Sequence, residues 1–105
     1  MKLTEADKQQ IKRDVVERLR GEPEVRKIVI FGSFPSSADP RDLDVAVFQD
    51  SDQTYLPLAM KYRRLLRPVA DRIPLDVLPF RSSVPGGWFV RDEVLCGEVV
   101  YEREQ

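Results

Sequence analysis

Apolar residues recur at helical spacing near the start of the chain. Ile11, Val15 and Leu19 are each four positions apart, and the residues between them are mostly charged or polar. Thr4 precedes this pattern and is a favoured residue for the N-terminal cap of a helix. The pattern therefore predicts an amphipathic helix over residues 4–20.

Two apolar runs that follow the helix are typical of strands. Residues 25–31 are rich in β-branched side chains and are apolar on both faces in the middle of the run, as expected of a buried central strand. Over residues 43–48 the side chains alternate, with Leu43, Val45 and Val47 on one face and Asp44, Ala46 and Phe48 on the other. Because the connection between the runs is short, we expect the two strands to pair antiparallel.

The rest of the chain continues to alternate between helices and strands. We predict a helix over 54–67, a strand over 73–80, a short helix over 88–95 and a last strand over 99–101. Pro68 should end or kink the second helix, and the prolines that flank the third strand favour an edge position. The order of the elements predicts one α/β (α+β) domain over residues 1–105, with a small mixed β-sheet flanked by helices.

Composition narrows the chemistry that such a domain can perform. The 105 residues include no histidine and one cysteine, so histidine-based nucleophile systems, internal disulfides and histidine- or multi-cysteine zinc sites cannot form from this chain alone. The 17 basic and 18 acidic residues give a net charge of −1, which argues against a domain that holds nucleic acid by bulk charge. No apolar run is typical of a membrane span or a signal peptide, and with the cysteine usage this leads us to expect a cytoplasmic protein.

Three aspartates stand out in the predicted strands. Asp42 and Asp44 are two positions apart, so in an extended chain they should project to the same face, about 7 Å apart at two rises of about 3.3 Å. Asp76 lies between Leu75 and Val77, where a buried charge needs a partner. The alternatives are that Asp42 and Asp44 are a solvated pair at the exit of a turn and that Asp76 is an edge-strand residue facing water. If the third strand lies beside the second, all three carboxylates share one face and can bind one or two Mg²⁺ ions, and Mn²⁺ accepts the same oxygen ligands.

Gly32 and Ser33 end the first strand and suit the binding of phosphate. Glycine lets a phosphate approach the backbone, and the N–H groups of a following helical turn, with the Ser33 hydroxyl, can bind a triphosphate. A Gly-Ser pair alone is typical of an ordinary turn and helix cap, with Ser33 as the cap. Only its combination with the aspartates indicates nucleotide chemistry.

This combination, Gly32-Ser33 followed by Asp42-Leu43-Asp44 and a later Asp76, resembles the nucleotidyltransferase superfamily related to DNA polymerase β. The small size resembles the minimal members of that superfamily, and the C-terminal stretch FVRDEVLCGEVVYER is similar to the end of those proteins. The resemblance implies the polymerase β-like nucleotidyltransferase fold. It also implies a partner, because many minimal members are similar to antitoxins paired with a HEPN-domain toxin.

The resemblance assigns a role to each candidate residue. Gly32 and Ser33 would bind the phosphates of the nucleotide. Asp42 and Asp44 would ligate both Mg²⁺ ions. Asp76 would be the third ligand and would help to deprotonate the attacking hydroxyl. Some members of this superfamily transfer AMP from ATP to a tyrosine of the partner toxin.

Two functions stay open from the sequence. The leading hypothesis is a metal-dependent nucleotidyltransferase that attaches a nucleoside monophosphate, AMP from ATP, to a hydroxyl of a HEPN-type helical partner. The alternative is a non-catalytic module of the same fold that neutralises or scaffolds such a partner, and it is favoured by Ser36-Ser37 standing where the family commonly has Arg-Gly. An enzyme that acts on nucleic acid is disfavoured by the net charge. Homo-oligomer formation is left open.

Two further features have alternative interpretations. Lys61, Arg63, Arg64 and Arg67 lie opposite the apolar stripe of the second predicted helix and form either a solvated face or a docking face for an acidic partner. Trp88 is either an anchor of the core or a contact to the nucleotide.

Overall fold

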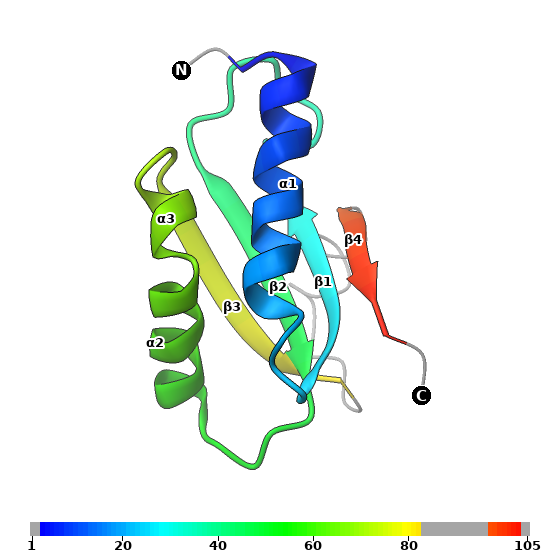
Figure 1. Cartoon of the computed structure of the whole chain (residues 1–105), viewed down its shortest axis with the longest axis vertical. Coiled ribbons are helices and arrows are strands. Elements are labelled where there is room, and N and C mark those ends of the chain that lie inside the picture. Colours follow the sequence, from blue (N-terminus) through cyan, green and yellow to red (C-terminus); the bar gives the residue numbers. More distant parts are fainter. Residues whose placement is uncertain (1–2, 83–96, 104–105) are drawn as a thin grey trace.

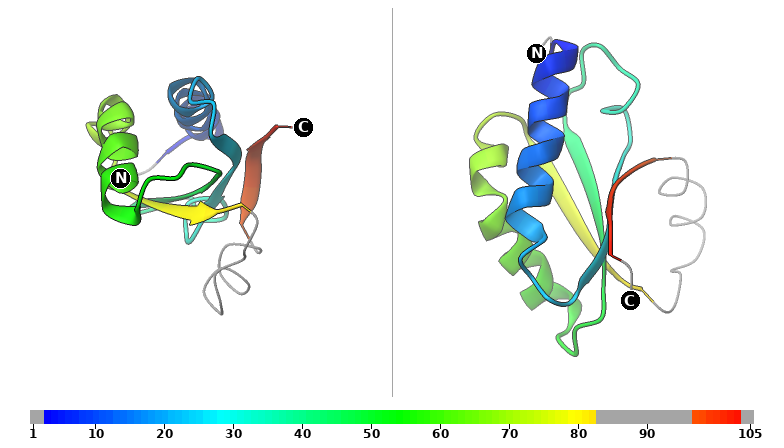
Figure 2. Two further views of the ribbon diagram at one scale, coloured as in Figure 1. Left: turned by 90° about the horizontal axis from the view of Figure 1, so that it is seen from below. Right: turned by 45° about the vertical axis from the view of Figure 1, so that its right-hand side comes forward.

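The computed structural model describes residues 3–82 and 97–103, which form a mixed four-stranded sheet with its helices on one face (Figures 1 and 2). The elements are, in chain order, α1 (Glu5–Leu19), β1 (Val25–Phe31), β2 (Leu43–Gln49), α2 (Tyr55–Leu65), α3 (Arg67–Ala70), β3 (Leu75–Arg81) and β4 (Glu98–Glu102). The predicted α/β (α+β) class with a small mixed sheet is confirmed. The helix predicted over 88–95 lies outside the described residues.

The strands lie in the order β3-β2-β1-β4. β1 pairs antiparallel with β2, as the short connection predicted, and antiparallel with β4 on its other side. β2 pairs parallel with β3, and the chain crosses between them through α2 and α3. β3 is an edge strand of the described sheet, as its prolines predicted. Proline has no N–H to donate to the ladder, and an edge strand needs no such hydrogen bonds on its outer side.

The two faces of the sheet carry separate apolar clusters. Leu43, Val45 and Val47 face the helices and belong to the main core, which also contains the apolar stripe of α1. Ala46 belongs to a smaller cluster on the opposite face, and Phe48 is partly buried against that cluster. The alternation predicted for β2 is confirmed, and it puts Asp44 on the face that the described helices do not cover.

The helix termini follow the local sequence with one exception. Thr4 caps α1 as predicted: its Oγ1 accepts from the Asp7 backbone N–H at 3.0 Å, and its own N–H donates to the Asp7 carboxylate at 3.0 Å. The helix predicted over 54–67 is confirmed as α2, but its end is misplaced. α2 ends at Leu65, and Pro68 lies in the first turn of the separate helix α3, where its missing N–H costs no intrahelical bond.

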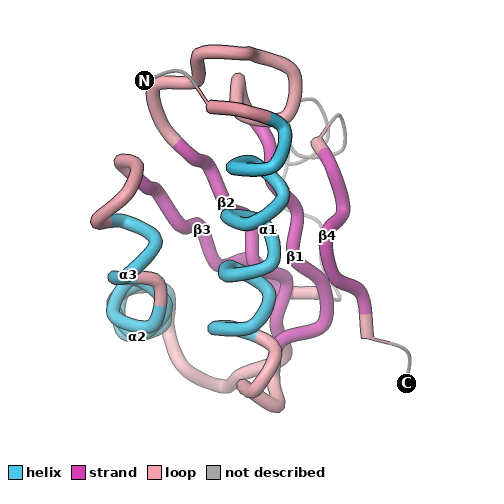
Figure 3. The backbone as a smooth tube through the Cα atoms, turned by 45° about the horizontal axis from the view of Figure 1, so that its top comes forward, coloured by secondary structure: helices cyan, strands magenta, loops and turns pink. Residues whose placement is uncertain are grey.

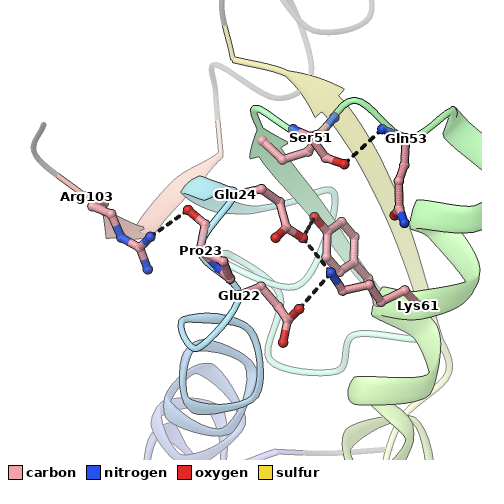
Figure 4. Close-up of polar contacts among 9 residues, drawn as sticks. Glu22, Pro23, Glu24, Ser51, Gln53, Lys61 and Arg103 are labelled. Carbon is pink, nitrogen blue, oxygen red and sulfur yellow. Dashed lines mark hydrogen bonds and ion pairs between the residues drawn. The ribbon is translucent and has the colours of Figure 1, made fainter.

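A polar cluster fixes α2 against the turn before β1 (Figure 4). The Lys61 ammonium lies 2.7 Å from Glu22 and 2.8 Å from Glu24, and the hydroxyl of the buried Tyr62 donates to Glu24 at 2.8 Å. Burial, together with Glu24, raises the pKa of Tyr62 far above its ordinary value, so the hydroxyl stays protonated and remains a donor. The cluster therefore holds α2 at a fixed place beside the sheet.

Replacing Tyr62 by phenylalanine should lower the free energy of unfolding by about 1–2 kcal/mol, because it removes a hydrogen bond to a largely buried carboxylate. Urea denaturation at neutral pH measures the change. Tyr55→Phe is the matched control, since the Tyr55 side chain is exposed, and it should leave the stability unchanged. An equal effect of the two substitutions would contradict the anchoring role of the Tyr62 hydroxyl.

Glu24 should make the stability sensitive to acid. Burial raises the pKa of the Glu24 carboxyl, but hydrogen bonds from Lys61 and Tyr62 together lower it by more, so the pKa in the folded chain lies below the ordinary 4.5. A depressed folded pKa contributes stability that is present above about pH 4.5 and is lost as the pH falls further. Glu24→Gln should therefore cost about 1–2 kcal/mol at pH 7 and less at about pH 3, as measured by urea denaturation at the two pH values. A difference that does not change with pH would contradict this role.

Candidate active site

The backbone turns sharply where β1 ends. Gly32 has a φ of +77°, a left-handed conformation that glycine adopts without strain. Phe31 is paired across the ladder with Asp44, so the Asp44 side chain lies against this turn. A Cβ atom at Gly32 would lie 2.4 Å from Asp44 Oδ2. The backbone conformation therefore favours glycine at position 32, and a larger residue there would displace the Asp44 carboxylate.

The turn after Gly32 is fixed by its own backbone and by a buried aromatic ring. The Ser33 carbonyl accepts from the N–H groups of Ser36 at 3.3 Å and Ser37 at 2.9 Å, which closes one turn rather than a helix. The Ser33 side chain is exposed, whereas Phe34 is fully buried in the main core. The loop that contains this turn lies beside the start of α1, where Leu3 N–H donates to the Ala38 carbonyl at 3.3 Å (Figure 3). Ser33 is thus presented to solvent at a fixed place.

Asp44 and Asp76 are brought together by the pairing of β2 with β3. They occupy the same register position on two adjacent parallel strands. Neighbouring strands are about 4.8 Å apart, and residues in register project to the same face. The expectation that the third strand lies beside the second and aligns these two aspartates is therefore confirmed.

Of the two alternatives for Asp76, the buried charge is wrong and the edge-strand residue that faces water is confirmed. Its side chain is 64% exposed because β3 lies at the edge of the sheet. The Arg63 guanidinium approaches the Asp76 carboxylate at 3.9 Å, and this exposed ion pair contributes little to stability. Asp76 is instead a solvent-accessible carboxylate beside the half-buried Asp44.

The second strand begins at Leu43 as predicted, which leaves Asp42 just outside it. Asp42 is an exposed residue of the loop that precedes β2. The Leu43 N–H donates to the Pro74 carbonyl at 2.8 Å, which ties the start of β2 to the start of β3. Asp42 therefore lies at the end of the sheet where Asp44 and Asp76 are found, although it does not alternate with them in a regular strand.

The donor chemistry of these residues suits Mg²⁺, which takes carboxylate oxygen ligands. Within residues 3–82 and 97–103, no group of three or more Asp, Glu, Cys or His side chains is gathered closely enough to hold a metal ion. Asp44 and Asp76, in register beside the Gly32 turn, are the pair that the fold brings together. Asp42 is the candidate third ligand and lies in the loop just before β2.

Sequence reasoning missed Phe34 as the residue that fixes the turn after Gly32, the candidate phosphate-binding turn. The sequence does indicate a buried anchor at this position, because Phe34 is a large apolar side chain in a loop that is otherwise rich in proline, serine and aspartate. Trp88, for which the sequence leaves a core anchor and a nucleotide contact as alternatives, lies outside the described residues.

Comparisons with known proteins do not identify a family. No protein-family model matches the chain, and no curated protein matches it. Among the helices that the structure describes, none is both long enough and apolar enough to cross a lipid bilayer.

Proposed function

We propose that this chain is a metal-dependent nucleotidyltransferase that transfers a nucleoside monophosphate, AMP from ATP, to a hydroxyl group of a partner protein. The observation that carries the proposal is the register of Asp44 with Asp76, next to a glycine turn that leaves room for the Asp44 carboxylate. The mixed sheet with its helices on one face is compatible with the polymerase β-like nucleotidyltransferase fold, which forms part of the same proposal.

Each residue has a defined role in the proposed reaction. Gly32 and Ser33 bind the triphosphate through backbone N–H groups and the serine hydroxyl. Asp44 and Asp76 would hold Mg²⁺, with Asp42 joining them from the preceding loop, and the bound ion would neutralise charge on the triphosphate and on the departing pyrophosphate. The acceptor oxygen attacks the α-phosphorus, the bond to pyrophosphate breaks, and Asp76 takes the proton of the acceptor hydroxyl. The exposure of Asp76 suits this role because the acceptor must reach it from solvent.

The acceptor belongs to a second protein in this proposal. The described elements form one small sheet with its helices and include no further unit that could hold an acceptor. A HEPN-type helical protein, the partner that the sequence resemblance implies, is the proposed acceptor and toxin, with this chain as its antitoxin. The proposed location is the cytoplasm, where ATP and Mg²⁺ are both abundant.

A non-catalytic scaffold of the same fold is the second candidate. It is favoured by Ser36-Ser37, which carry no positive charge at the place where the superfamily commonly has an arginine. A scaffold should neutralise its partner equally well after Asp42, Asp44 and Asp76 are all changed to asparagine. An enzyme should lose that ability together with transfer.

Isothermal titration calorimetry with each of the four ribonucleoside triphosphates, with and without Mg²⁺, tests the leading proposal without knowledge of the acceptor. We expect Mg²⁺-dependent binding of at least ATP to the wild type and none to Asp42→Asn/Asp44→Asn. The control variant Asp52→Asn/Asp71→Asn removes the same charge from two other exposed aspartates and should bind as the wild type does. Absence of Mg²⁺-dependent binding, or binding that survives the first variant, would overturn the proposal.

A further inference from the structure

The outer side of α2 carries an exposed stripe that is apolar at one end and basic at the other. Leu56 is 65% exposed and Met60 is 59% exposed, and they are four residues apart, so they adjoin on one helix face. Arg63 and Arg64 follow at helical spacing on the same side and are exposed. Arg67, also exposed, continues the basic end into α3. These five residues are the outer stripe.

The outer stripe lies opposite the side of α2 that packs on the sheet. Leu58, Tyr62 and Leu66 are buried in the main core, and they fall between the residues of the outer stripe along the helix. Leu56 and Met60 adjoin on the outer side, and both are more than half exposed. A partner that covers them would remove apolar surface from water, which is favourable.

The charge of the outer stripe is unbalanced. Residues 54–70 contain four basic residues and no acidic one. Lys61 is already neutralised by Glu22 and Glu24 (Figure 4). Arg64 and Arg67, by contrast, have no ion pair with any of the residues in 3–82 and 97–103. The stripe therefore offers two guanidinium groups that are ready to pair with carboxylates from another molecule.

We propose that the outer stripe is a docking surface for an amphipathic helix of another protein, whose apolar side chains cover Leu56 and Met60 and whose acidic side chains pair with Arg64 and Arg67. A helix fits because its side chains at i, i+3, i+4 and i+7 match a straight stripe on a facing helix. Charge complementarity decides the sign of the charge on the partner helix, which carries Glu or Asp on the side that meets the basic end of the stripe.

Two other occupants fit the stripe less well. A second copy of this chain would bring two basic, acid-free segments into one interface, where like charges repel. A nucleic acid would pair with the arginines but would leave Leu56 and Met60 uncovered, and the chain as a whole has a net charge of −1.

Docking at this surface puts the partner beside the candidate active site. Arg63 of the outer stripe lies 3.9 Å from Asp76 at the edge of the sheet. A helix on the stripe would therefore lie close to the carboxylate proposed to take the acceptor proton. Only this consequence rests on the proposed function. Docking itself does not depend on catalysis.

The test uses the full chain and two synthetic helical peptides of equal length, both with a leucine stripe, one flanked by glutamates and the other by lysines. Fluorescence anisotropy at low ionic strength should show at least about tenfold tighter binding of the acidic peptide. Met60→Glu should weaken that binding by about tenfold, and Arg64→Glu/Arg67→Glu should reverse the preference in favour of the lysine peptide. The control Arg13→Glu/Arg18→Glu makes the same charge change on exposed residues of α1 and should leave the preference unchanged.

Several outcomes overturn the docking surface. These are failure of the acidic peptide to bind, a preference that Arg64→Glu/Arg67→Glu does not reverse, and tighter binding of an oligonucleotide RNA than of the acidic peptide. Sedimentation of the chain alone provides one more test. If the chain self-associates and Met60→Glu abolishes the self-association, the stripe binds a second copy of the chain and the docking proposal is overturned. Titration of the same variants with Mg²⁺ and ATP separates this result from failure of the proposed function, because the stripe variants should bind ATP as the wild type does.

Discussion

Substituting asparagine for Asp44 should lower Mg²⁺-dependent ATP binding and nucleotidyl transfer by at least about 100-fold, the scale on which removal of one electrostatic group of an active site acts. Asparagine keeps the shape of the side chain, which lies against Gly32, but removes the negative charge that attracts the ion. The fold should therefore survive. Calorimetric titration with ATP and Mg²⁺ measures the loss, and circular dichroism checks the fold.

Asp52→Asn is the control for this substitution because Asp52 is exposed and lies in the loop after β2. It removes one negative charge from the chain, as Asp44→Asn does, but away from the candidate site. It should leave ATP binding unchanged. Binding by Asp44→Asn within about twofold of the wild type would exclude Asp44 as a ligand of the nucleotide-bound metal.

Alanine at position 32 should be as damaging to ATP binding as the loss of Asp44. The added Cβ would lie 2.4 Å from Asp44 Oδ2, so the carboxylate has to leave its place. The φ of +77° adds a backbone cost of about 1–2 kcal/mol, which should appear as reduced stability to urea. We therefore expect a folded but less stable protein that no longer binds ATP in the presence of Mg²⁺.

Gly21→Ala separates this effect from a general intolerance of glycine substitution. A Cβ at Gly21 meets nothing within 4 Å, and its φ is not positive. This control should retain both stability and ATP binding. If Gly32→Ala binds ATP normally, the position of the Asp44 carboxylate against Gly32 does not matter for the site.

The elements that depend on local chemistry could be predicted from the sequence. The capping box of Thr4 and Asp7 starts α1 where the sequence indicates. Pro74, just before β3, and Pro79, inside it, fit the edge position that the sequence predicts. The break between α2 and α3 was misjudged. Pro68 fits either the end of one helix or the first turn of the next, and the sequence pattern does not distinguish them.

The candidate site could be predicted only in part, because its geometry depends on tertiary pairing. The register of Asp44 with Asp76 follows from how β3 adds to β2, which the sequence suggested but could not fix. The exposure of Asp76 follows from its edge position and not from its apolar neighbours. The contact of Gly32 with Asp44 depends on a φ value that sequence alone permits but does not determine.

The contacts that were missed altogether join residues that are far apart in the sequence. Glu24 binds Lys61 and Tyr62 across more than thirty positions, and Arg103 donates to the Pro23 carbonyl at 2.9 Å (Figure 4). No local pattern marks such pairs, since glutamate and arginine are common on any surface. They become visible only when the fold brings the segments together.

Paramagnetic broadening by Mn²⁺ tests the proposed metal site most directly. Backbone amide signals of the isotope-labelled chain would be recorded by NMR while Mn²⁺ is added in trace amounts, with and without ATP. We predict that the amides of Gly32, Asp44 and Asp76 broaden first and that ATP strengthens the effect. Strongest broadening around another acidic group, such as Glu22 and Glu24, or broadening that ATP does not change, would contradict a nucleotide-bound metal at Asp44 and Asp76.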